Sequence, residues 1–302
     1  MQKFTKSRSR NIAVFPILIW SLAVLWCTIF LFFVGWGIMT SLKSTIGFYM
    51  NSWGFSKLEY YGESGWALEN YVKAFTVMKI NTSRFGWVYF GDMLFNTLYY
   101  VFVYAFVGIL APMLCSYVYA KYSKRLPWVK IVWVLVLISL YVPISASLGA
   151  SLNLAATLGI YDNIFLFVIA SFGPFGSEFL IYYAIWKGLS WEYAEAAFID
   201  GASHWTVLVR IMFPMTATVF WVLFVTKVIA LWTDYTTPML FLPSYPTLAY
   251  GVYSFQNSVD QGASGVPIKI ASLVAVALPI FILFMFMKEK MMGSLTMGGL
   301  KG

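Results

Sequence analysis

Residues 189–214, LSWEYAEAAFIDGASHWTVLVRIMFP, lie between two apolar stretches and carry the most specific pattern in the chain. Ser190 is a favourable N-cap residue, and Glu192 in the first turn suits the positive end of a helix dipole. Gly201 tolerates the left-handed backbone with which many helices end, and Ser203 can cap a second helix. This stretch therefore predicts two short helices joined by a glycine bend.

The predicted second helix has apolar residues on one side, because Trp205, Leu208 and Ile211 recur at helical spacing. Alanines keep the surface of the first helix shallow, and acidic residues flank it. Such a surface is suited to lying in a groove of another protein. The alternative is an amphipathic hairpin at the membrane surface that has no partner.

Six apolar stretches, two of which flank residues 189–214, are long enough to cross a membrane. About 20 apolar residues span the hydrocarbon layer as a helix, because a helix satisfies its own backbone hydrogen bonds. We therefore expect one all-α polytopic membrane domain over residues 1–302. Its six transmembrane helices are predicted at 12–39, 94–118, 128–148, 163–186, 213–233 and 267–287. The first is too long for the apolar core of a signal peptide, so we expect it to be retained.

The composition agrees with a chain that lies largely in lipid. Of 302 residues, 61% are hydrophobic and 11% are charged, and the mean hydropathy is +0.77. Roughly a quarter of the residues of a soluble domain are charged, which excludes an ordinary soluble enzyme. The net charge is +8, and the basic residues lie between apolar stretches, which indicates membrane orientation and not nucleic-acid binding. Cys27, Cys115 and the single histidine, His204, predict neither a disulfide framework nor a metal site.

Basic residues predict the side of the membrane that each loop faces. They gather at the N-terminus, between the second and third stretches, after the fourth, and in the C-terminal tail. Because cytoplasmic loops carry an excess of lysine and arginine, both termini, residues 189–212 and the tail at 288–302 are expected to be cytoplasmic. Segments 41–93 and 234–266 are then external, and both are large enough to contact partners.

The stretch EAAFIDG at 195–201, followed by IMFP at 211–214, resembles the EAA signature of membrane subunits of binding-protein-dependent ABC importers. That signature reads E-A-A-x3-G-x9-I-x-L-P, and the spacing here is complete. Phe213 stands where leucine is usual. Ser190 stands where the carbohydrate branch of the family usually has proline.

Other parts of the chain resemble the same family. The tail SLTMGGLKG at 294–302 is similar to the glycine-rich ending of the maltose-type second permease subunit, with Ser294 in place of glycine and Gly299 in place of alanine. Weaker similarities lie at 68–71 (LENY), 96–97, 174–175 and 232–238. The resemblance thus extends over most of the chain and indicates the carbohydrate branch.

The resemblance implies a type I ABC importer permease fold in a bacterial or archaeal cytoplasmic membrane. A second, homologous permease would complete the pathway, a pair of ABC ATPase subunits would supply the work, and an extracytoplasmic sugar-binding protein would deliver a carbohydrate, in particular an oligosaccharide. The chain is then no enzyme and binds no cofactor itself. ATP and Mg²⁺ would belong to the ATPase subunits, in agreement with the absence of a G-x-x-x-x-G-K-[ST] loop from this sequence.

The resemblance also assigns roles by position. The residues expected to couple to the ATPase are Glu195, Ala196, Ala197, Asp200, Gly201, Ile211 and Pro214. Gly201 is equally compatible with a plain helix C-cap. The tail residues expected between the ATPase subunits are Thr296, Gly298, Lys301 and Gly302, and a frayed terminus is the alternative.

Candidates for the external side and the sugar pathway are less specific. Residues Gln256, Asn257, Asp260 and Gln261 are expected in a loop that reaches the binding protein, although a flexible connector fits them as well. Charges inside apolar stretches usually face a cavity or a partner, because they are costly in lipid. The pathway candidates are Tyr141, Asn153, Glu178, Lys227, Trp232, Asp234 and Tyr235. Lys227 could instead reach the membrane surface or pair with the sister subunit.

Two other functional classes compete with this interpretation. An ion-gradient-driven secondary transporter is favoured by acidic residues in broken helices, and Gly173-Pro174 beside Glu178 is a feature of that kind. An intramembrane enzyme would need grouped His, Asp or Cys side chains at one depth, and the sequence offers no such group around Glu178 or Asp234.

Overall fold

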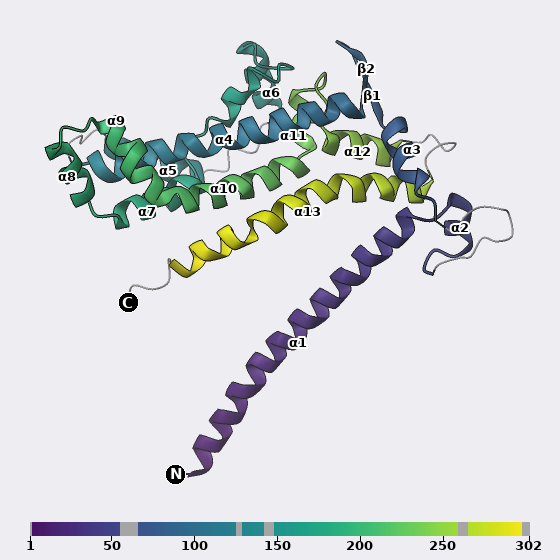
Figure 1. The fold of residues 1–302 in the computed structure, drawn as a ribbon, viewed down its shortest axis with the longest axis horizontal. Coiled ribbons are helices and arrows are strands. Elements are labelled where there is room, and N and C mark those ends of the chain that lie inside the picture. The colour runs from purple at the N-terminus through teal and green to yellow at the C-terminus, as the bar shows by residue number, and fades with distance from the viewer. Residues whose placement is uncertain (1, 55–65, 125–128, 142–147, 259–264, 298–302) are drawn as a thin grey trace. The chain divides into compact units, whose positions relative to one another are not determined.

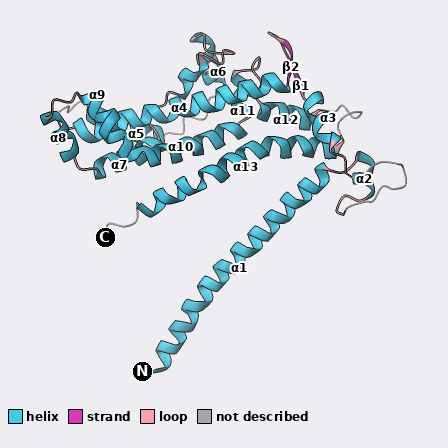
Figure 2. Cartoon of the chain, in the orientation of Figure 1, coloured by secondary structure: helices cyan, strands magenta, loops and turns pink. Residues whose placement is uncertain are grey.

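The computed structural model describes residues 2–54, 66–124, 129–141, 148–258 and 265–297. These residues are mostly helical and divide into two compact units. The first unit contains residues 1–77 and 258–275, and the second contains residues 78–257 and 276–302. Figure 2 shows helix throughout both units and a single short pair of strands among the described residues.

The first unit is built around the end of a long apolar helix, α1 (Gln2–Ser41), which is followed by α2 (Thr45–Met50) and α3 (Glu69–Val77). The buried Asn70 amide donates hydrogen bonds to the carbonyl oxygens of Ser41, at 2.9 Å, and Lys43, at 2.7 Å. The last carbonyl groups of a helix have no hydrogen-bond partner within the helix, so Asn70 supplies a donor at the end of α1. Burial lowers the pKa of the Lys43 ammonium, which donates to the carbonyl oxygen of Asn51 at the end of α2.

The second unit begins with a β-hairpin and continues as packed helices (Figure 1). Strands β1 (Lys79–Thr82) and β2 (Gly86–Tyr89) are antiparallel, with Lys79 opposite Tyr89. No strand was expected in residues 41–93, the segment predicted to be external. The helices that follow are α4 (Phe90–Tyr122), α5 (Lys130–Tyr141), α6 (Leu148–Thr157), the 3₁₀ turn η4 (Phe167–Ser171), α7 (Ser177–Gly188), α8 (Glu192–Ile199), α9 (His204–Val207), the π-helical segment η5 (Leu208–Met212), α10 (Phe213–Thr233), α11 (Thr236–Phe241) and α12 (Leu248–Asn257).

Helix α4 is the centre of the second unit. It packs mainly against α7 and α10 and also contacts η4, α12 and β2. Its fully buried side chains, Tyr100, Val101, Tyr104, Ala105 and Ile109 among them, recur at helical spacing. Helix α13 (Val266–Met297) contributes its first part to the first unit and the remainder to the second.

Four helical stretches among the described residues are long and apolar enough to cross a membrane: Phe15–Ser41, Phe90–Tyr122, His204–Thr233 and Val266–Lys288. They overlap four of the six expected spans. In the region of the third, α5 ends at Tyr141, and residues 142–147 lie outside the described part of the chain. The total of six transmembrane helices and the cytoplasmic placement of the termini stay predictions.

The fourth expected span differs from a single helix. Residues 163–186 contain η4, then a non-helical stretch at 172–176, and then α7. Pro174 explains the interruption, because proline lacks a backbone N–H and disfavours helical geometry at the preceding residue, Gly173.

Candidate functional site

The coupling element, defined as residues 189–212, folds as two short helices with a bend between them. Gly201 follows α8 with φ of +83°, and a Cβ atom there would meet nothing within 4 Å. The backbone conformation, and not lack of space, therefore favours glycine at this position. The Ser203 hydroxyl accepts a hydrogen bond from the Thr206 N–H at 3.2 Å and caps α9. The predicted helices, bend and second cap are confirmed.

The apolar side of the second helix differs from the prediction. Val207, Leu208 and Met212 are buried, whereas the Trp205 side chain is 67% exposed. A π-helical segment, η5, lies between α9 and α10. Trp205 and Leu208 were expected on one side of this helix, but Trp205 is exposed and Leu208 is buried, because the π-helical turn that begins at Leu208 changes which residues share a face.

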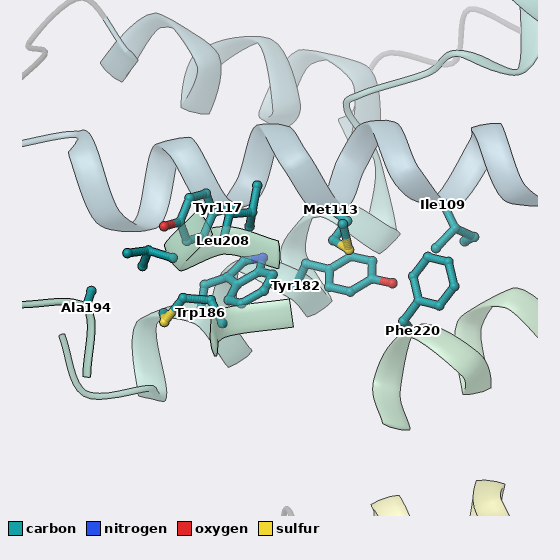
Figure 3. Close-up of a cluster of buried hydrophobic side chains, with 10 residues drawn as sticks. Ile109, Met113, Tyr117, Tyr182, Trp186, Ala194, Leu208 and Phe220 are labelled. Carbon is teal, nitrogen blue, oxygen red and sulfur yellow. The ribbon is translucent and has the colours of Figure 1, made fainter. Parts of the chain in front are cut away.

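A cluster of buried side chains attaches the coupling element to three other helices (Figure 3). Ala194 of α8 is fully buried in this cluster, as are Trp186 and Tyr182 of α7. The remaining members are Ile109, Met113 and Tyr117 of α4, Val207 of α9, Leu208 and Met212 of η5, and Phe220 of α10. The coupling element is therefore packed directly against α4, α7 and α10.

Polar contacts add to the attachment at the end of α4. The Lys121 ammonium donates to the Leu189 carbonyl oxygen at 2.7 Å, and it lies 5.7 Å from the centroid of the Trp191 ring. The Tyr122 hydroxyl forms a 2.8 Å hydrogen bond with Nδ1 of His204, the first residue of α9. The coupling element is thereby joined to α4 on both sides of the Gly201 bend.

The coupling element has both apolar and acidic side chains that are exposed. Ile199 is 87% exposed and Tyr193 is 55% exposed, and Trp205 lies on the same short element. The side chains of Glu192, Glu195 and Asp200 are exposed as well. Ala196 is exposed and Ala197 is half-buried against the cluster, so Ala194 is the alanine of α8 that packs inward. Ile211 is half-buried and Pro214, in the first turn of α10, is exposed.

Two of the pathway candidates, Glu178 and Lys227, lie together. Nζ of Lys227 on α10 is 3.7 Å from Oε1 of Glu178 on α7, and the two side chains are 36% and 29% exposed. Gly108 of α4 lies beside this pair, and a Cβ atom there would be in ordinary van der Waals contact with Cε of Lys227, at 3.5 Å. The non-helical stretch at 172–176 immediately precedes α7.

Three further candidates organise the residues after α10. The Trp232 indole donates to the Val276 carbonyl oxygen at 2.9 Å. Asp234 accepts hydrogen bonds from the Tyr100 hydroxyl, at 2.9 Å, and from the Thr237 N–H, at 3.1 Å. The Tyr235 ring stacks on that of Tyr253, with centroids 4.2 Å apart. The other two candidates, Tyr141 on α5 and Asn153 on α6, are exposed.

Similarity to known proteins decides the family. No protein-family model matches the chain. The chain is 30% identical over 210 residues to the maltodextrin transport system permease protein MdxG of Bacillus subtilis, across 68% of this chain and 74% of MdxG. It belongs to the family of sugar ABC transporter permeases.

Other relatives agree with this placement of the permease. It is 24% identical over 287 residues to the diacetylchitobiose uptake system permease protein NgcG of Streptomyces coelicolor. The matched region covers 92% of the permease and 86% of NgcG. The fold matches a chain of a bacterial ABC transporter involved in the import of the acidic polysaccharide alginate, with a TM-score of 0.67 and 16% identity, over 93% of the permease and 97% of that chain. The expected family and fold are thus confirmed at this level.

The remaining predicted contact residues of the permease are only partly described. Gln256 and Asn257 end α12, and the Asn257 amide donates to the Tyr253 carbonyl oxygen at 2.8 Å. Thr296 lies near the end of α13. Asp260, Gln261, Gly298, Lys301 and Gly302 lie outside the described residues.

Sequence reasoning missed a hydrogen-bonded junction around Asp162. This residue has φ of +50°, and its carboxylate accepts from the Ser244 N–H, at 2.8 Å, and from the Ser244 hydroxyl, at 2.6 Å. The Asp162 N–H donates to the Phe241 carbonyl oxygen, and the Arg84 guanidinium donates to the Asp162 carbonyl oxygen. Arg84 and Ser244 are each about 80 residues from Asp162 in the sequence, so no local sequence pattern predicts the junction.

The described residues of the permease contain no group of three or more His, Cys, Asp and Glu side chains that could hold a metal ion.

Proposed function

We propose that this chain is one permease subunit of an ATP-driven importer in a bacterial or archaeal cytoplasmic membrane. With a second, homologous permease it forms the pathway for a carbohydrate, and an extracytoplasmic solute-binding protein delivers that carbohydrate. A pair of ABC ATPase subunits binds ATP and Mg²⁺ and docks on the cytoplasmic side. The chain has six transmembrane helices, both termini in the cytoplasm and no catalytic or cofactor site of its own.

One observation carries this proposal: the coupling element exposes large apolar and acidic side chains while its buried residues pack against α4, α7 and α10. Ile199 is the most exposed large apolar side chain in the described residues, at 87%. Exposed apolar patches with polar borders mark sites of protein contact. Glu192, Glu195 and Asp200 are exposed on the same short segment as Ile199, so the docking groove on the ATPase is expected to be apolar with a basic rim.

The carbohydrate substrate is supported by the relatives. MdxG is described as a maltodextrin permease and NgcG as a diacetylchitobiose permease, and both compounds are oligosaccharides. The cargo of this chain is accordingly proposed to be an oligosaccharide. Which sugar is carried depends on the binding protein and on the sister permease as well as on this chain.

The mechanism follows from the attachment of the coupling element. When the ATPase subunits close around ATP, they displace the element, and the helices packed on its inner face move with it. Such rigid-body movement converts an inward-open pathway into an outward-open one. Glu178 and Lys227 are proposed to face this pathway, because neither a paired charge nor the non-helical backbone at 172–176 is stable against lipid.

Removal of the exposed apolar anchor tests the proposal. The chain is co-expressed with its sister permease and ATPase, extracted in detergent and tested for ATPase recovery and for sugar uptake in vesicles. Ile199→Glu and Glu195→Lys are expected to reduce ATPase recovery at least about tenfold, the equivalent of 1.4 kcal/mol. Phe85→Glu, a change of the same kind at a residue that is 55% exposed on the β-hairpin, serves as the control and is expected to leave recovery unchanged.

Two results would contradict the proposed function. One is unchanged ATPase recovery and uptake in both variants. The other is accumulation of sugar by the purified chain without ATPase subunits in response to an ion gradient, which would identify a secondary transporter.

A further inference from the structure

Helix α4 is hydrogen-bonded at one end to the coupling element and at the other end to the segment that follows α10. It has 33 residues, which at 1.5 Å per residue gives a length of about 50 Å. Both sets of bonds lie within the second compact unit. The segment at the far end, residues 234–248, is called the loop segment below and contains α11.

At the first end, the attachment uses the last two residues of α4. Lys121 donates to the Leu189 carbonyl oxygen, where the chain enters the coupling element, and Tyr122 is bonded to His204, where the second short helix begins. The Tyr122 ring also makes edge contacts with the rings of Trp191 and His204. The end of α4 therefore contacts the coupling element before and after the Gly201 bend.

At the other end, three residues on two successive turns of α4 bind the loop segment. The Thr97 hydroxyl accepts from the Leu248 N–H at 2.8 Å and donates to the Met93 carbonyl oxygen. The Asn96 amide donates to the Pro246 carbonyl oxygen at 3.1 Å, and the Tyr100 hydroxyl donates to Asp234 at 2.9 Å. Thr97 and Tyr100 are each 1% exposed, so these bonds are protected from competition with water.

Between its two ends α4 is a continuous helix (Figure 1). Pro112 lies inside it and removes one backbone hydrogen bond, which in an unsupported helix would favour a kink. Here Pro112 is buried, and Ile109 and Met113 on either side pack in the cluster with Tyr182 and Phe220. Packing from α7 and α10 therefore supports the helix where its own bonding is weakest.

We propose that α4 couples the ATPase-facing coupling element to the loop segment, so that contact with the binding protein and the state of the ATPase influence each other through this helix. Tyr122 and Thr97 are the positioning residues at its two ends. This inference rests on the proposed function, because it needs an ATPase at the coupling element and a binding protein on the opposite side. Coupling between two sites is reciprocal, so cutting either end weakens the same interaction.

The test removes one hydroxyl at each end in the complete complex. The importer is reconstituted in nanodiscs, and ATP hydrolysis is measured with and without sugar-loaded binding protein. Tyr122→Phe keeps the ring but loses the bond to His204, and Thr97→Val loses the bond from Leu248. Each is expected to lower the ratio of stimulated to unstimulated hydrolysis about threefold to tenfold, the range of one hydrogen bond. The double variant is expected to have the same ratio as the single variant with the lower ratio, because both changes interrupt one route.

Matched controls separate this role from a general loss of structure. Tyr99→Phe removes a hydroxyl of α4 that has no hydrogen bond among the described residues, and Thr226→Val removes one that donates only to its own helix, at Val222. Both are expected to keep the stimulation ratio, and Thr97→Ser, which retains the hydroxyl, is expected to restore it.

An unchanged ratio in both single variants would overturn the inference, and so would losses that multiply in the double variant. Either result leaves ATPase recovery by the unaltered chain intact. Failure of the proposed function would instead appear as loss of ATPase binding or stimulation in the unaltered complex, so the two failures are distinguishable.

Discussion

Lys227 on α10 and Glu178 on α7 form an ion pair, with Nζ and Oε1 separated by 3.7 Å. The two residues come from helices that both pack against α4, and Gly108 of α4 lies beside the Lys227 side chain. Each charge compensates the other, so the stability of this region depends on their balance more than on either group alone.

Neutralising one member of this pair is expected to lower the stability of the chain more than neutralising both. An unpaired charge near the middle of a membrane helix costs roughly 2.5–3.5 kcal/mol, which is an upper limit here because both side chains are partly exposed. Glu178→Gln and Lys227→Gln are each expected to lower the melting temperature in detergent. The double variant Glu178→Gln/Lys227→Gln is expected to melt closer to the unaltered chain.

The exposed pair between Glu69 and Lys73 on α3 provides the comparison. Exposed pairs contribute little, so Glu69→Gln is expected to change stability by less than about 1 kcal/mol. If the double variant at 178 and 227 melts below both single variants, the two charges act separately and the argument from compensation is wrong.

Two alanines of the coupling element are expected to respond differently to enlargement. Ala194 is fully buried in the cluster that contains Trp186, whereas Ala196 is exposed. Ala194→Leu forces extra volume into a packed site, which typically costs about 1–3 kcal/mol, and should lower the melting temperature. Ala196→Leu should leave the melting temperature unchanged but reduce ATPase recovery, because the larger side chain blocks close approach.

Thermal unfolding and ATPase pull-down are measured on both variants. Equal effects of the two substitutions on stability would show that α8 does not bury one particular face. Unchanged ATPase recovery with Ala196→Leu would remove Ala196 from the docking surface.

The features predictable from sequence are those encoded within a few residues. Gly201 and Ser203 predict the bend and the second cap because a left-handed C-cap and a hydroxyl N-cap are local requirements. The apolar stretches predict long helices for the same reason. The spacing of the coupling element also indicated the family.

Features that depend on distant partners were not predictable. Tyr122 and His204 are 82 residues apart, and nothing near either residue indicates their hydrogen bond. Glu178 and Lys227 were recognised as unusual charges, but their pairing depends on how α7 and α10 pack. Trp205, Leu208 and Ile211 were expected on one side because periodicity assumes a regular α-helix, and η5 departs from that geometry.

Gly201 is expected to tolerate asparagine better than a branched residue. Its φ of +83° is unfavourable for residues with a Cβ atom, and the left-handed conformation costs such residues about 1–2 kcal/mol. Gly201→Val should therefore destabilise the bend and reduce ATPase recovery. Gly201→Asn should retain most of both, because asparagine visits this conformation readily.

Space is no obstacle to either side chain, since a Cβ atom at Gly201 would meet nothing within 4 Å. Melting temperature and ATPase pull-down of the two variants check the prediction. Equal impairment by valine and asparagine would mean that the ATPase itself requires a bare backbone at this position, and that the bend is not the reason for glycine.

Removal of the Asp162 carboxylate is expected to release the loop that contains Ser244. The carboxylate accepts two hydrogen bonds from Ser244, and bonds to charged groups contribute about 1.5–3 kcal/mol each in buried sites. Asp162→Ala should therefore lower the melting temperature and speed proteolysis after residue 241. Ser244→Ala, which keeps its backbone N–H, should have about half of this effect.

Because Asp162 has a positive φ, further substitutions can separate the contribution of its hydrogen bonds to stability from the cost of its backbone strain. Asp162→Gly loses both bonds but removes the unfavourable contact of a Cβ atom, so it should be more stable than Asp162→Ala by about 1 kcal/mol. Asp162→Asn keeps an acceptor for the Ser244 N–H and tolerates the same backbone, and should be the mildest of the three. If alanine and asparagine melt alike while glycine matches the unaltered chain, strain dominates at this junction and the bonds to Ser244 contribute nothing measurable.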